Sequence, residues 1–237
     1  MSNYDQRSAP PGFSANEAAA IDPGLRAYML RVYNYMAAGV ALTGIAAFLT
    51  YAFTGPELLQ SPLMWIFILA PLGLVFFISA RINTLSVEAA RGLFFLYAAL
   101  VGISLSTIFH AYTQSSITRV FFIAAATFGA LSLWGYTTRR NLSGFGTFLF
   151  MGLIGIIIAT LVNLFLGSSG LDWIISIIGV GVFAGLTASD TQRIRGMYDR
   201  GDDAASAGRK AVMGALSLYL NFINLFTMML RLTGDRR

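Results

Sequence analysis

The residues best placed for chemistry in this sequence surround one aspartate. Asp190 follows 17 uncharged residues, Trp173–Ser189, in the segment Thr187–Ile194, which reads TASDTQRI. A carboxylate in such an apolar setting is costly unless it faces protein or water and has a partner. Arg193 lies three residues on, on the same helical face, and can form a local ion pair. The alternative interpretation is a titrating carboxylate beside an ion pathway.

A second polar feature lies in the last apolar run, Ala211–Leu230. Small and polar residues recur there at spacings of three and four and therefore share one helical face: Gly214, Ser217, Asn221 and Asn224. Within a bilayer such a face must turn toward protein or toward water. The pattern predicts either helix packing reinforced by hydrogen bonds or the lining of a polar pathway, and the stripe alone favours neither.

Two other groupings lack the geometry that their chemistry needs. His110 is the only histidine and follows Ser106 by four residues, but no third group is visible to orient a Ser–His pair. The three aspartates Asp199, Asp202 and Asp203 lack the spacing of a calcium-binding loop and its closing glutamate. We expect them to solvate a loop and cap the next helix. The sequence predicts a protein that is not an enzyme and needs no cofactor.

Seven uncharged runs of 17 to 31 residues must position these side chains. A helix that crosses a hydrocarbon core ~30 Å thick needs about 20 apolar residues. Barrel strands would alternate polar and apolar residues, which these runs do not. The sequence therefore predicts an all-α integral membrane protein with seven transmembrane helices. Residues 1–26 are expected to form a flexible cytoplasmic tail, and residues 27–234 a single seven-helix membrane domain.

The net charge of +5 reflects topology rather than a nucleic-acid partner. Of the 16 Lys and Arg residues, 12 lie in the N-terminal segment and in alternate links between the runs. The positive-inside rule places that side in the cytoplasm, with the N-terminus. Arg231, Arg236 and Arg237 conflict with this rule if the seventh helix crosses fully. Either that helix is partly re-entrant or the rule fails there; the arginine count favours a cytoplasmic tail.

Four segments carry a resemblance to a known family. Thr187–Ile194 resembles the sixth-helix signature of the Bax inhibitor-1 family, and Ser217–Phe226 (SLYLNFINLF) resembles its seventh-helix signature. Leu100–Phe109 is similar to the third helix of the family, and Arg31–Gly44 to its first. The two signatures occur in the right order, and the similarity covers nearly the whole chain.

The resemblance implies six helices around a central seventh and a calcium leak that responds to pH. In the family, one aspartate on helix six and one on helix seven share a proton, and an arginine near the end of helix two latches to them. Asp190 matches the first aspartate, and Arg81 matches the latch arginine. The second aspartate position holds Asn221. An Asp–Asn pair can form a hydrogen bond, but it lacks the repulsion that splits the titration of two carboxylates.

Two functions of different classes follow. The first is a pH-modulated leak channel for calcium, or another cation, in the bacterial inner membrane. The second is a regulatory membrane protein that binds a membrane-bound protease or another assembly and passes no ions. A proton-coupled transporter is disfavoured because the chain shows no inverted repeat. The candidate gating residues are Asp190, Asn221 and Arg81, and the candidate pathway or packing residues are Ser217, Asn224 and Gly214.

Overall fold

The computed structural model describes residues 22–54 and 61–237 of the chain. Within these residues every regular element is a helix, in the order α1 (Pro23–Phe53), α3 (Pro62–Arg81), α4 (Val87–Leu105), α5 (Thr107–Ala111), α6 (Gln114–Thr137), α7 (Ser143–Leu166), α8 (Ser169–Gly196) and α9 (Ala204–Thr233). Seven segments are long and apolar enough to cross a membrane, with α4 and α5 counting as one. The predicted all-α, seven-span architecture is confirmed.

The first helix begins earlier than the sequence led us to expect. The carboxylate of Asp22 accepts a hydrogen bond of 2.9 Å from the backbone N–H of Gly24, and Pro23 occupies the first helical position. Both features start helices, because they satisfy or remove backbone donors that lack a partner in the first turn. Residues 23–26 of the predicted flexible tail therefore belong to α1. Residues 1–21 of that tail lie outside the described residues.

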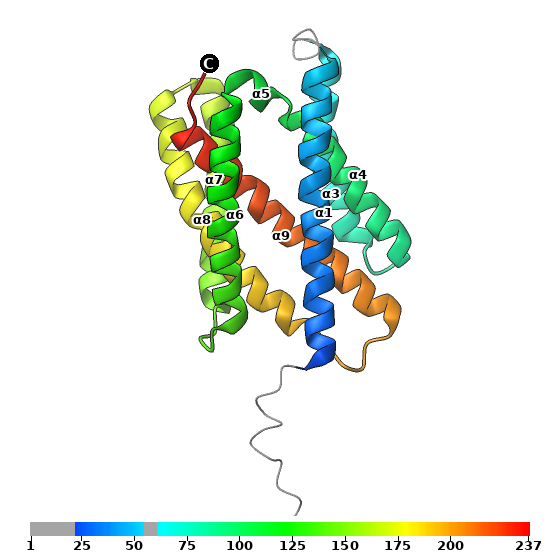
Figure 1. Ribbon diagram of the computed structural model, residues 1–237. Helices are drawn as coiled ribbons and strands as arrows, with labels where there is room; N and C mark the ends of the chain where they lie inside the picture. Colours follow the sequence, from blue (N-terminus) through cyan, green and yellow to red (C-terminus); the bar gives the residue numbers. More distant parts are fainter. Residues whose placement is uncertain (1–21, 55–60) are drawn as a thin grey trace, which may run out of the picture.

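Helix α9 is the centre of the bundle. Of its apolar segment 61% is buried inside the protein, against 11% for α7. It packs mainly against α1, α4, α6 and α8, whereas α3 and α7 pack on α4 and α8. In Figure 1, α9 crosses the bundle obliquely through its middle. The polar stripe predicted on the seventh helix therefore lies on the most enclosed element of the fold.

Hydrogen bonds between helices hold α9 and its neighbours together. The hydroxyls of Thr43 on α1 and Tyr219 on α9 lie 2.6 Å apart, and Thr43 also donates to the carbonyl of Ala98 on α4 at 2.9 Å. A second seam joins Tyr33 on α1 to Ser132 on α6 at 2.6 Å, and Ser132 to Thr191 on α8 at 2.9 Å. Such hydrogen bonds fix how the helices are oriented toward one another. Contacts between apolar surfaces are not directional and cannot do this in a lipid environment.

The chain ends on the side of the bundle opposite to the start of α1. We call these sides the N-terminal end and the C-terminal end of the bundle (Figure 1). Backbone hydrogen bonds of 3.1 Å tie Asp235 to Thr113 and Arg237 to Ala111, in the segment between α5 and α6. With 30 residues, α9 is about 45 Å long, which is long enough to cross the hydrocarbon core. The structure therefore favours a full crossing of α9, with the C-terminal tail on the side opposite to the N-terminus, over a re-entrant helix.

Single-cysteine labelling will test this arrangement, because the chain contains no cysteine. Cysteines at Ser206 and at Ser168 are expected to react from opposite sides of the membrane. A cysteine at Arg237 is expected to react from the same side as Ser168, because α9 crosses the bundle. The positive-inside rule places Ser206 in the cytoplasm. Labelling of Ser206 and Arg237 from one side would contradict the arrangement.

An ion pair at the N-terminal end links the start of α1 to the loop before α9. Arg200 donates a hydrogen bond of 2.7 Å to the carboxylate of Asp22. This bond lowers the pKa of Asp22 below its usual range, and the N–H of Gly24 acts in the same direction. Because the folded state favours the ionised form, the stabilisation is complete above the unfolded pKa of about 3.9 and is lost as the pH falls through the lower folded value.

Asp22→Asn is therefore expected to destabilise the protein near neutral pH and to have less effect in acid. Asparagine keeps the helix cap but removes the charge that Arg200 binds. Thermal unfolding in detergent at pH 6 and at pH 3 measures the difference between the variant and the wild type. A difference of equal size at both pH values would contradict the prediction.

Candidate functional site: a polar groove along α9

Asp190 lies at the contact between α8 and α9. Its Oδ1 accepts bonds of 2.8 Å and 3.1 Å from the guanidinium of Arg193, one turn further along α8. Its Oδ2 accepts a bond of 2.8 Å from the amide of Asn221 on α9. An ionised carboxylate only accepts, so the amide must present its NH₂ group here. The local ion pair with Arg193 is confirmed, and the Asp190–Asn221 pair is in hydrogen-bond contact.

Arg193 extends this cluster to the polar stripe. The same Nη2 that binds Asp190 lies 3.2 Å from the hydroxyl oxygen of Ser217. Ser217 and Asn221 are one turn apart on α9, so Arg193 and Asp190 together cover one stretch of the stripe. The side chain of Asp190 is only 18% exposed, whereas that of Arg193 is 59% exposed. The carboxylate of Asp190 is thus enclosed by α8 and α9, whereas the guanidinium of Arg193 is accessible from outside the protein.

Arg81 does not take part in this cluster. It closes α3, which packs on α4 rather than against α8 and α9. Its backbone carbonyl accepts hydrogen bonds from Thr84 and Leu85, and its side chain is exposed. No ion pair joins Arg81 to Asp190 in this structure. The guanidinium beside Asp190 belongs to Arg193, so the latch position that the resemblance assigned to Arg81 is occupied by a residue of α8.

A cavity of about 1100 Å³ runs along this side of the bundle. We call it the polar groove after the stripe of α9 that borders it; most of its lining surface is apolar. Leu72 of α3 contributes to its wall, and the remaining walls come from the α6–α7 link and from α7, α8 and α9. Its polar lining consists of Asn141, Ser143, Thr147, Thr160, Ser189, Asp190, Gln192, Arg193, Ser217, Asn221, Asn224, Thr227 and Arg231. The stripe therefore faces a space rather than a packed helix along much of its length.

The groove follows α9 over about half of its length. Its lining runs from Ser217 to Arg231, 14 residues further on, which is about 21 Å along the helix axis. At its far end Arg231 forms an ion pair of 3.0 Å with Asp172, in the first turn of α8. At its near end Gln192 donates to the carbonyl of Arg140 and accepts from the N–H of Leu142. One arginine–aspartate pair thus lies within the groove, and a second lies at its far end, where Arg231 but not Asp172 belongs to the lining.

Some residues of the stripe line the groove, and others form packing contacts between helices. Asn224 lines the groove, and its amide donates to the carbonyl of Leu220 at 2.8 Å. Gly214 does not line the groove. A Cβ at Gly214 would lie 2.9 Å from the side chain of Ile194 and 3.4 Å from that of Val32. Gly214 is therefore a packing position, where α9 approaches α8 and α1 closely.

Several groove residues were missed at the level of sequence. Thr227 continues the stripe three residues after Asn224, and the same spacing could have identified it. Gln192 and Arg231 carry no local signal, because their partners lie in the α6–α7 link and on α8. Within residues 22–54 and 61–237, no three His, Cys, Asp or Glu side chains come together as a metal site. The predicted capping role is confirmed for Asp203, which accepts from the N–H of Ser206 at the start of α9.

The fold and the groove define a class of protein. A bundle of seven apolar helical spans is built around one of them, α9, whose polar side borders a long cavity lined by the carboxylate of Asp190. The family described as "Inhibitor of apoptosis-promoting Bax1" matches residues 25–237. The chain belongs to this family, the Bax inhibitor-1 family.

Bacterial relatives cover almost the whole chain. The inner membrane protein YbhL of Escherichia coli is 48% identical over 221 residues, which are 90% of this chain and 94% of YbhL. The protein RP147 of Rickettsia prowazekii is 46% identical over 91% of this chain and 92% of its own length. The membrane protein SpyM3_0260 of Streptococcus pyogenes is 39% identical over 90% and 94% of the two chains.

Cysteine substitution will show whether water reaches the stripe. Cysteines at Ser217, Asn221 and Asn224 are expected to react with small hydrophilic thiol reagents, because all three line the polar groove. Cysteines at Leu218 and Phe222 are expected to react more slowly, because neither side chain lines the polar groove. Equal reactivity around the helix would mean that the groove gives water no preferred path.

Proposed function

We propose that this protein is a pH-modulated calcium leak channel of the bacterial inner membrane, with its N-terminus in the cytoplasm. The observation that carries the proposal is the polar groove: a cavity of about 1100 Å³ that borders the stripe of α9 and holds Asp190. Carboxylate, amide and hydroxyl oxygens are the ligands that calcium prefers. Membership of the Bax inhibitor-1 family and the inner membrane relative YbhL support the proposed class and location.

Asp190 is the proposed site of pH control. When ionised, it offsets part of the positive charge that Arg193 and Arg231 give the groove, and it holds Arg193 beside Ser217. Protonation removes the charge and weakens the bond to Arg193, so the guanidinium is released from the carboxylate. Asn221 keeps its contact with Asp190 in either state, because an amide can donate or accept. In this proposal a single carboxylate, that of Asp190, rather than a pair of aspartates sets the pH response of the channel.

A bulky residue in the groove tests the proposed path. Thr160→Trp places an indole in the wall of the groove on α7, whereas Ile158→Trp changes the exposed surface of the same helix. Calcium flux into liposomes is expected to fall several-fold for Thr160→Trp and to stay near the wild-type rate for Ile158→Trp. Equal flux in both variants would remove the groove as the path.

If the purified protein passes no ions at any pH, the second candidate function, a regulatory membrane protein, is favoured instead. In that case the apolar outer surface of the bundle would serve a regulatory complex with a membrane-bound protease or another assembly. The liposome measurement separates the two functions because it contains no partner protein.

A further inference from the structure

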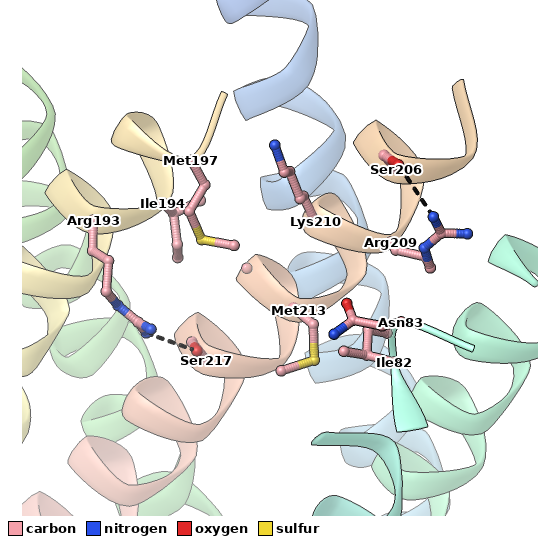
Figure 2. A pocket seen from close by; sticks show the side chains of 11 residues that line it. Ile82, Asn83, Arg193, Ile194, Met197, Ser206, Arg209, Lys210, Met213 and Ser217 are labelled. Atoms are coloured by element: carbon pink, nitrogen blue, oxygen red, sulfur yellow. Dashed lines mark hydrogen bonds between the residues drawn. The ribbon is translucent and has the colours of Figure 1, made fainter. Parts of the chain in front are cut away.

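A second, smaller cavity lies at the N-terminal end of the bundle. It has a volume of about 270 Å³ and lies between the end of α3, the end of α8 and the start of α9 (Figure 2). We call it the basic pocket. It shares two lining residues, Arg193 and Ser217, with the polar groove. Its occupancy can therefore act on the cluster around Asp190.

Positive charge dominates the lining of this pocket. Arg193 reaches it from α8, and Arg209 and Lys210 reach it from α9 (Figure 2). None of its 11 lining residues is acidic. Lys210 is paired with Asp202 at 2.6 Å, outside the lining. Arg209 donates to the neutral hydroxyl of Ser206 at 3.1 Å and is within electrostatic reach of the carboxylate of Asp203, but no ion pair among the described residues holds its guanidinium.

The rest of the lining is apolar or carries hydroxyl groups. Ile82, Ile194, Met197 and Met213 form apolar walls, and Ser206 and Ser217 offer hydroxyls. A soluble anion would use only the cations and hydroxyls, whereas a phospholipid would use both parts. Guanidinium groups bind phosphate oxygens through charge-assisted hydrogen bonds, and basic pockets between transmembrane helices suit lipid headgroups. The combination favours a lipid over a free phosphate.

We propose that the basic pocket binds the headgroup phosphate of an anionic phospholipid, and that this lipid competes with Asp190 for Arg193. Arg209 and Arg193 contact the phosphate, Lys210 contributes its charge while it stays bonded to Asp202, and the methionine and isoleucine side chains contact the adjoining acyl region. The positive-inside rule places this end of the bundle in the cytoplasmic leaflet. Binding of the lipid is independent of whether the protein conducts ions.

The competition follows from the position of Arg193. One nitrogen of its guanidinium serves both Asp190 at 2.8 Å and Ser217 at 3.2 Å, and Ser217 borders both cavities. A lipid phosphate on the side of the basic pocket draws the guanidinium away from the carboxylate. By reciprocity, removal of the carboxylate charge must strengthen lipid binding. The lipid thereby acts on the residue to which the proposed pH control is assigned.

Native mass spectrometry of the delipidated full-length protein tests the binding. Phosphatidylglycerol is expected to bind more tightly than phosphatidylcholine of the same acyl chains. Arg209→Gln is expected to weaken phosphatidylglycerol binding by about five-fold, the effect of one basic residue near a membrane surface. Arg209→Lys keeps the charge and most of the binding. Arg139→Gln is the matched control, because Arg139 is exposed at the same end but does not line the pocket.

Two further measurements test whether the bound phosphate belongs to a lipid or to a soluble anion, and whether the lipid competes with Asp190 for Arg193. Glycerol 3-phosphate is expected not to displace phosphatidylglycerol at equal concentration; displacement would show a soluble anion site and overturn the assignment to lipid. Asp190→Asn is expected to tighten phosphatidylglycerol binding, because Arg193 is then free of its partner. Equal affinity of the two lipids for the wild type, or equal losses in Arg209→Gln and Arg139→Gln, would overturn the pocket as a lipid site. Unchanged affinity in Asp190→Asn would overturn the competition.

Discussion

Asp190→Asn is expected to abolish the pH dependence of the calcium flux that we propose for this protein. Asparagine has nearly the same shape and can keep a bond to Asn221, but it does not titrate. Among the residues that the structure describes, Asp190 is the only acidic one that lines the polar groove, and Asp172 beside Arg231 lies beyond that lining. No other groove carboxylate can replace it. Flux into liposomes over a pH series, compared between variant and wild type, measures the effect.

Asn221→Asp is expected to move the pH response toward higher pH. The amide nitrogen of Asn221 lies 2.8 Å from Oδ2 of Asp190, so the variant brings two carboxylates into direct contact. Two such groups cannot easily both ionise, and one keeps its proton to higher pH.

Two arginines provide a matched comparison: Arg193 lies beside Asp190 and Asn221, and Arg81 lies away from them. Arg193→Gln is expected to move the response in the same direction as Asn221→Asp, because Asp190 loses its cation. Arg81→Gln is expected to leave the response unchanged, since Arg193 holds the position beside Asp190. A profile unaltered by both Asp190→Asn and Asn221→Asp would reject Asp190 as the control point.

Gly135→Ala is expected to give the largest loss of stability among single methyl additions on α6. A Cβ at Gly135 would overlap the carbonyl oxygen of Ala188 on α8 and would lie 2.9 Å from its carbonyl carbon and Cα. These are backbone atoms, so no side-chain rotation relieves the contact and the two helices must separate. Overpacking of this kind costs about 1–3 kcal/mol. Separation of α6 and α8 would also stretch the bond between Ser132 and Thr191.

Gly129→Ala is the control for this substitution. Gly129 lies on the same helix, but a Cβ there meets nothing within 4 Å. The exchange from glycine to alanine changes helix propensity equally at both positions. Thermal unfolding in the same detergent is expected to show a lower Tm for Gly135→Ala and a Tm near that of the wild type for Gly129→Ala. Equal values would show that α6 and α8 do not approach each other this closely.

The features that the sequence predicted well are properties of a single helix. Uncharged runs identify spans because a charge inside hydrocarbon is costly wherever it occurs. The stripe at Ser217, Asn221 and Asn224 follows from helical periodicity, and the groove lies along it. The ion pair between Asp190 and Arg193 was also within reach, since its members are one turn apart on α8.

The features that escaped prediction depend on which helices are neighbours. Arg81 was assigned beside Asp190, but α3 packs on α4 and leaves that place to Arg193. Arg231 and Asp172 are 59 residues apart and meet only because α9 crosses the whole bundle beside α8. Gly214 shares the periodicity of the stripe but packs against Ile194 and Val32. Sequence spacing places a residue on a helical face, but it does not say what that face meets.

Calcium uptake by liposomes that contain only the purified protein tests the proposed leak channel most directly. The measurement runs over a pH series, with empty liposomes and Asp190→Asn protein in parallel. The polar groove and its single carboxylate predict uptake above that of empty liposomes, with a pH dependence that Asp190→Asn lacks. Uptake equal to that of empty liposomes at every pH would contradict the proposal that the groove conducts calcium.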